Sequence, residues 1–163
     1  MTITNDKATL KRKIITLILT IVATGMIALL LFTELGDSPV LGQERNTWIL
    51  LIVILYLLYL GYHYMMNYYF FYYSDSHNKL LFRFYPVLSI SPERKAIEIP
   101  KKDFDHYEIT KSFFDRKGKI LLYQQMPQGL ARYPALSITL LSKEEKQKLF
   151  ESLDQYSSKP KEK

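Results

Sequence analysis

The hydrophobic pattern divides the chain into two long apolar runs and a longer region in which apolar and polar positions alternate. Residues 14–33 and 48–66 contain no Asp, Glu, Lys or Arg. In an α-helix each residue adds 1.5 Å, so runs of this length reach about 30 Å, the thickness of a bilayer's hydrocarbon core. The pattern therefore predicts transmembrane helices at 14–33 and 48–66, joined by a short polar loop at 34–47.

The basic residues predict an orientation for this hairpin. The N-terminal segment 1–13 holds Lys7, Lys11, Arg12 and Lys13, whereas the loop 34–47 holds a single basic residue, Arg45. Lysine and arginine favour the cytoplasmic side of a membrane. We therefore expect a multi-pass membrane protein, with the N-terminus and the C-terminal domain in the cytoplasm. The absence of cysteine fits a reducing compartment.

After the second run the period changes to that of β-strands. Residues 67–73 are aromatic-rich, which favours a strand, so we expect the helix to end near Met66 and a strand to begin almost at once. Further strands are predicted where β-prone runs are bounded by turn residues. The predicted segments are 79–85, 87–91, 95–100, 104–110, 119–125 and 135–141, with 126–134 as a loop.

Two of these segments give more detailed expectations. In 104–110 the alternation places Phe104, Tyr107 and Ile109 on the inward face. Between the next two strands the sequence DRKGK predicts a hairpin turn, in which Gly118 would take a positive φ.

The chain ends with the signature of an amphipathic helix. Ser142 and Glu145 form a capping-box pattern, in which each side chain bonds the other residue's backbone. One face of the following helix is expected to carry Leu149, Phe150, Leu153 and Tyr156. The polar tail 157–163 follows. Residues 67–156 are therefore predicted to be a small antiparallel β-sandwich or barrel, capped by one C-terminal helix.

At this point a family resemblance can be stated. The segments AIEIPKKDFDHYEI and YPALSITLLSKEE, together with the order of two spans, a β domain and a terminal helix, resemble bacterial pleckstrin-homology-like domains attached to pairs of membrane helices. The resemblance covers residues 67–156 and rests on hydrophobic patterns rather than on catalytic motifs. It implies a PH-like fold and a binding or scaffolding module instead of an enzyme.

Basic residues collect at the predicted turns of this domain. Beside an anionic leaflet such residues attract headgroups, but we favour ordinary loop solvation as their explanation, because acidic residues are interspersed. The candidates for binding lipid or a partner are Arg94, Lys95, Lys101, Lys102, Lys111, Arg116, Lys117 and Lys119.

A stripe of small residues marks one side of the first span. Such a stripe allows the backbones of two membrane helices to approach closely. The partner helix is either the second span of the same chain, which we favour, or a helix of another protein. The stripe consists of Thr16, Thr20, Thr24 and Ala28.

Residues capable of chemistry are few. If Asp103, Asp105 and His106 lie in one strand, the two aspartates point to one face and the histidine points to the other. The three side chains are therefore not expected to converge on a metal ion. His63 is near the inner end of the second span and is expected to lie at the interface between membrane and water. No phosphate-binding loop, zinc motif or nucleophile motif is found in the sequence.

These observations predict no catalytic residues, no cofactor and no metal. They also argue against a transporter, because neither span carries a buried charge, and against nucleic-acid binding. We expect an interaction protein that binds a protein partner, itself or anionic headgroups at the membrane. The alternative is an accessory subunit of a larger membrane enzyme or transport complex, docked through the small-residue stripe.

Overall fold

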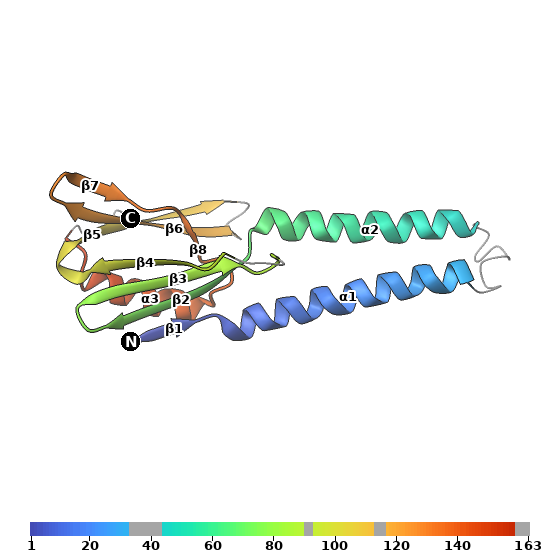
Figure 1. The fold of residues 1–163 in the computed structure, drawn as a ribbon, viewed down its shortest axis with the longest axis horizontal. Helices are drawn as coiled ribbons and strands as arrows, with labels where there is room; N and C mark the ends of the chain where they lie inside the picture. Colours follow the sequence, from blue (N-terminus) through green and yellow to red (C-terminus); the bar gives the residue numbers. More distant parts are fainter. Residues whose placement is uncertain (33–43, 90–92, 113–116, 159–163) are drawn as a thin grey trace. The chain divides into compact units, whose positions relative to one another are not determined.

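The structure, a computed structural model, describes residues 1–32, 44–89, 93–112 and 117–158. It consists of two long helices, antiparallel β-sheets and a C-terminal helix (Figure 1). The chain divides into two compact units. One contains Met1–Leu10 with Met66–Lys163 and is called the β domain here, and the other is the helical hairpin Lys11–Met65.

Both long helices are apolar enough to cross a membrane. Helix α1 spans Asp6–Phe32 and helix α2 spans Arg45–Met66. Their length and apolar composition make them candidate membrane spans. Each begins before its apolar run, so the basic residues between Asp6 and Ile14 form the first turns of α1. Most of the predicted loop 34–47 lies outside the described residues.

The first sheet of the β domain has the strand order β1-β2-β3-β4, and neighbouring strands are antiparallel. Aromatic residues on β2 and β3 face each other across the sheet, with Phe71 opposite Phe84 and Tyr73 opposite Phe82. The strands are β1 (Thr2–Thr4), β2 (Tyr69–Ser76), β3 (Lys79–Pro86) and β4 (Lys95–Pro100).

Strand β1 is the main departure from the predicted organisation, which treated 1–13 as a segment separate from the domain. Thr2, Ile3 and Thr4 pair with Ser74, Tyr73 and Tyr72 of β2. Two adjacent strands of one sheet therefore flank the helical hairpin in sequence. If both helices cross the bilayer, the N-terminus and the domain lie on the same side of it.

The second sheet has the order β5-β6-β7, and β8 also pairs with β6. Between the sheets the chain forms the short 3₁₀ helix η2 (Lys101–Asp103). The strands are β5 (Phe104–Ser112), β6 (Lys117–Met126), β7 (Gly129–Arg132) and β8 (Leu136–Ser137).

Several local predictions are wrong. Val87 and Leu88 form a turn instead of starting a strand, and 90–92 lie outside the described residues. Strand β7 lies within the predicted loop 126–134, because its backbone pairs with β6 despite a weak hydrophobic pattern. The predicted strand 135–141 is reduced to β8, since the chain turns after Ile138 toward the last helix.

Gly118 also differs from its prediction. It lies within β6 opposite Lys111 and is not among the described residues with positive φ. A Cβ at this position would approach Ile138 Cγ1 to 3.1 Å, so glycine is favoured here by close packing instead of by a turn. The residues 113–116 of the predicted turn lie outside the described part of the chain.

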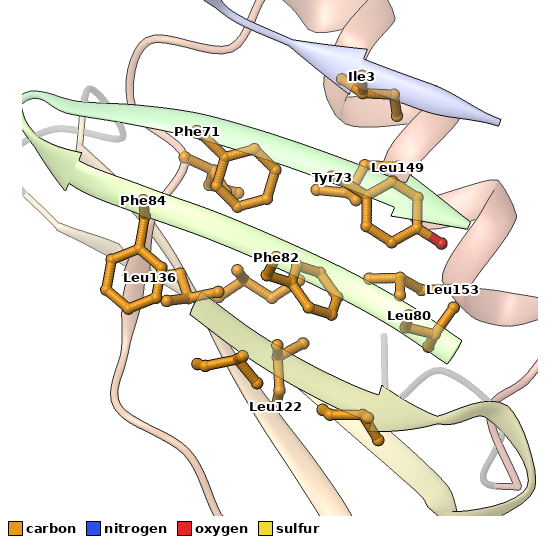
Figure 2. Packing of buried hydrophobic residues seen from close by; sticks show 14 of the residues in the cluster. Ile3, Phe71, Tyr73, Leu80, Phe82, Phe84, Leu122, Leu136, Leu149 and Leu153 are labelled. Carbon is orange, nitrogen blue, oxygen red and sulfur yellow. The ribbon is translucent and has the colours of Figure 1, made fainter. Parts of the chain in front are cut away.

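Helix α3 (Lys143–Asp154) has the predicted capping box. The Ser142 side chain accepts a hydrogen bond from Glu145 N at 3.2 Å, and Ser142 N donates to Glu145 Oε2 at 2.7 Å. Leu149 and Leu153 are fully buried. They enter one core with residues of both sheets, including Ile3, Phe71, Phe82, Leu122 and Leu136 (Figure 2).

Candidate functional site

Asn5 fastens the N-terminal strand to β2. Its side chain is buried, its Oδ1 accepts a hydrogen bond from Phe71 N at 2.9 Å, and its Nδ2 donates to Tyr69 O at 3.0 Å. Thr9 Oγ1 donates to the same Oδ1 at 3.2 Å. Because Asn5 immediately precedes α1, these contacts fix the point at which the chain leaves the β domain for the first helix.

The chain re-enters the β domain through a small apolar cluster. Met66 and Tyr68 pack with Val87 of the β3–β4 connection, and Leu140 packs against them. Together with Asn5, this cluster defines one end of the domain, which we call the helix-connected end. The starts of β4 and β6 lie at this end in Figure 1.

Contacts within the domain place several predicted basic residues at the helix-connected end. Lys111 lies opposite Gly118 in the pairing of β5 with β6. The carbonyl oxygen of Gly118 accepts a hydrogen bond from Ile138 N at 2.9 Å. Ile138 is two residues before Leu140, which packs against the Met66 cluster, so Lys111 lies toward that end of the domain. Arg94 directly precedes β4 and is exposed. Further basic residues of this region are Lys95, which pairs with Glu93 at 3.2 Å, and Lys117 and Lys119 at the start of β6. Arg116 lies outside the described residues.

Lys146 of α3 belongs to the same region, although no pattern in the sequence singled it out. Burial and the nearby ammonium of Lys111 lower the pKa of Lys146. Helix α3 runs antiparallel to β5, because Phe150 stacks on Tyr107 with ring centroids 5.7 Å apart and Tyr107 Oη donates to Asp154 at 2.7 Å. The positive charges of Lys111 on β5 and Lys146 on α3 therefore lie near each other at the helix-connected end.

Lys101 and Lys102 lie at the opposite end of the domain, where β2 turns into β3 and β4 leads into β5. Lys101 forms an ion pair with Asp75 and lies over the ring of Tyr156, 4.8 Å from its centroid. Asp75 also accepts a hydrogen bond from Tyr156 Oη at 3.0 Å. Lys101 thus connects η2 to β2 and to the segment that follows α3, whereas Lys102 is exposed.

The electrostatics of this contact follow from its geometry. Partial burial alone would raise the pKa of Asp75, but the hydrogen bonds from Lys101 and Tyr156 outweigh it, so the pKa is lowered. The hydrogen bond to Asp75 raises the pKa of Lys101. Each group favours the charged form of the other, which is the behaviour of a structural ion pair.

The residues Asp105 and His106 come together, contrary to the sequence prediction. A register irregularity in β5 between Phe104 and His106 breaks the strict alternation of side chains. As a result, His106 Nδ1 lies 2.6 Å from Asp105 Oδ2, and the imidazole stacks on Tyr123 with centroids 4.3 Å apart. The irregularity also accompanies an exposed Ile109, which was predicted to face inward.

This cluster is tied to the end of α3. Ser158 N donates to Asp105 O at 2.8 Å, and Ser158 Oγ donates to Asp105 Oδ1 at 3.0 Å. Asp103 lies in η2 and does not belong to the strand. Among the described residues, no group of three or more His, Asp or Glu side chains has an arrangement suited to a metal ion.

In the helical hairpin, two residues of the small-residue stripe contact α2. Thr16 Oγ1 lies 2.9 Å from Tyr59 Oη, and Thr20 Oγ1 lies 2.7 Å from Tyr56 Oη. Each threonine also donates its hydroxyl proton to the carbonyl four residues earlier, so the tyrosines are the donors in the contacts between helices. Thr24 is exposed and Ala28 half-buried.

Sequence reasoning missed several of these residues. Asn5 looked like part of a short polar terminus, and no local pattern relates it to β2, more than sixty residues away. His63 is buried, and its ring lies edge-on to Tyr59 with centroids 5.7 Å apart, while its expected position at the membrane interface stays a prediction. Comparison of the chain with protein-family models, curated proteins and solved structures gives no match.

Proposed function

We propose that this chain is a membrane-anchored interaction protein whose PH-like domain recognises a binding partner at the cytoplasmic face of a bacterial inner membrane. The bound species is a membrane protein, a second copy of the chain or an anionic headgroup. The observation that supports this proposal best is the insertion of the helical hairpin between β1 and β2, two adjacent strands of one sheet.

The arrangement of strands supports the PH-like part of the proposal. A four-stranded antiparallel sheet is followed by a second antiparallel sheet built on β5, β6 and β7, and then by one terminal helix. Leu149 and Leu153 of this helix complete the core formed by the two sheets. This is the organisation that the family resemblance leads us to expect.

The anchoring supports recognition at the membrane. Asn5 ties the domain to the start of α1, and the cluster around Met66 ties it to the end of α2, so the chain is held at two points. Restriction to the membrane plane raises the effective concentration of the domain for partners in the same membrane. Because this gain needs no new contacts, a small recognition surface is sufficient.

The polar clusters support recognition over catalysis. Asp75 and Lys101 join β2, η2 and α3, and Asp105 joins β5 to the segment that follows α3. These side chains are used in contacts that hold the domain together. The same is true of Thr16 and Thr20, which contact α2, so they do not favour the alternative of docking into a larger enzyme or transport complex.

The proposal is tested by crosslinking the full-length protein in cells, extracting it in a mild detergent and identifying the protein and lipid that co-purify. A reproducible protein partner would support partner recognition, and oligomers of the chain would support self-recognition. Enrichment of anionic lipid would support headgroup binding. Recovery of the protein without any of the three, at the level of an untagged control membrane, would contradict the proposal.

A further inference from the structure

Four separate parts of the chain carry basic side chains at the helix-connected end. Lys7 is exposed in the first turn of α1, two residues after Asn5. Arg94 is exposed beside the start of β4, and Lys111 is exposed near the end of β5. Lys146 adds a positive charge from α3 that is close enough to Lys111 to lower its own pKa.

The opposite end of the β domain has a different character. Asp75, Asp105 and Asp154 lie there, each accepting hydrogen bonds from elements that meet at that end. Lys101 is neutralised by Asp75. Among the described residues, more basic side chains therefore lie toward the helices than at the opposite end, where Lys79 and Lys102 are the exposed lysines.

We propose that the helix-connected end is a docking surface for the anionic headgroups of the leaflet at which α1 and α2 begin and end, with Lys7, Arg94 and Lys111 as its principal cations. This inference rests on the proposed function, because it takes the domain to be anchored in a membrane. It narrows that function by assigning a lipid-binding role to one defined part of the domain.

The adjacent membrane leaflet is the binding partner that fits this surface best. Two residues, Asn67 and Tyr68, separate α2 from β2, so the end of the domain at Met66 cannot move far from the membrane. Leu88, an exposed apolar side chain in the turn after β3, lies in the same connection as Arg94. An apolar side chain next to cations suits the boundary between headgroups and acyl chains.

The expected effect follows from the interaction of a single cation with an anionic leaflet. Each lysine or arginine near such a surface contributes about a five-fold factor to membrane association. Neutralising two of them, in the double variant Arg94→Gln/Lys111→Gln, should therefore lower the ratio of docked to undocked domain by about 30-fold.

The experiment uses the full chain reconstituted in phosphatidylcholine nanodiscs, with or without phosphatidylglycerol. Because the chain has no cysteine, Ser89→Cys provides a single site for an environment-sensitive fluorophore in the β3–β4 connection. The probe should report a less polar environment when phosphatidylglycerol is present, and added salt should reverse the change. The double variant should largely lose this response.

Two control variants distinguish a local surface from the effect of net charge. Lys79→Gln/Lys102→Gln removes the same charge from the opposite end and should retain the response. Arg94→Lys/Lys111→Arg keeps the charge and should retain it too. An equal loss in the Lys79/Lys102 variant, or no dependence on phosphatidylglycerol in the unaltered chain, would overturn the inference. A protein partner found by crosslinking would leave the proposed function standing in that case.

Discussion

The hydrogen bonds of Asn5 give the sharpest test of how the N-terminal strand is attached to the β domain. In the variant Asn5→Ala, Phe71 N loses its acceptor, Tyr69 O loses a donor, and Thr9 loses the acceptor of its hydroxyl. Asn5 is only 1% exposed, so water cannot readily replace these partners. A buried polar group left without a partner costs about 1–3 kcal/mol.

Taking the two backbone groups together, we expect Asn5→Ala to destabilise the attachment of β1 by about 3 kcal/mol. This corresponds to an increase of about 100-fold in the fraction of molecules in which the strand is detached. Hydrogen exchange of the protein in nanodiscs measures this opening directly. Protection of the amides of β1 should fall by that factor, while the amides of β6, which β1 does not contact in the sheet, should keep their protection.

The variant Thr9→Val is the matched control, because it removes a single hydrogen bond to the Asn5 side chain and nearly preserves the volume. Its effect should be about 1 kcal/mol or less. Unchanged exchange of β1 in Asn5→Ala would refute the reasoning. So would an equal loss of protection in β6, since it would show that the strand cannot open separately from the rest of the domain.

Three further predictions concern the core, the ion pair and the helices. Phe82→Ala should destabilise the β domain by about 3–5 kcal/mol in thermal unfolding, whereas Leu130→Ala, at a side chain that is 47% exposed, should have little effect. Unfolding followed against pH should show stability lost as the pH falls through the lowered pKa of Asp75, below its ordinary value of 3.8. At the alkaline end, stability should be lost as the pH rises above 10.5 through the raised pKa of Lys101, and Asp75→Asn should remove both changes if this pair causes them. Tyr56→Phe should weaken the helical hairpin by about 0.6 kcal/mol in a steric-trapping assay, and an equal effect of Tyr62→Phe would contradict the role of the Thr20 contact.

The sequence predicted the features that depend on neighbours close in the chain. The two apolar runs, the capping box of Ser142 and Glu145, and the buried face of α3 are each encoded within a few helical turns. Most strands were predicted as well, because aromatic and β-branched residues alternate along them. A pair of helices, antiparallel sheets and a C-terminal helix follow from these local patterns.

The basic residues show where such reasoning reaches its limit. In the sequence Lys101 and Lys111 are equivalent, since both follow strands and both have acidic neighbours. The fold separates them, because the pairing of β3 with both β2 and β4 brings Asp75 to Lys101. The hairpin of β5 and β6 leaves Lys111 exposed near Lys146. Which lysine is available for binding is decided by contacts between elements far apart in the chain.

What the sequence by itself determined is the two long helices, most of the strands, and the terminal helix with its buried face, because hydrophobic periodicity is a local property. The tertiary structure alone decided that β1 joins β2, that Asn5 fastens this junction, and that a register irregularity brings Asp105 to His106. Strand pairing and register depend on backbone hydrogen bonds, which any residue except proline can donate and which therefore leave little trace in the side-chain pattern. The side chain of Asn5 bonds a residue 66 positions away, so no local pattern predicts that contact. The attachment of the domain to both long helices belongs to this second group.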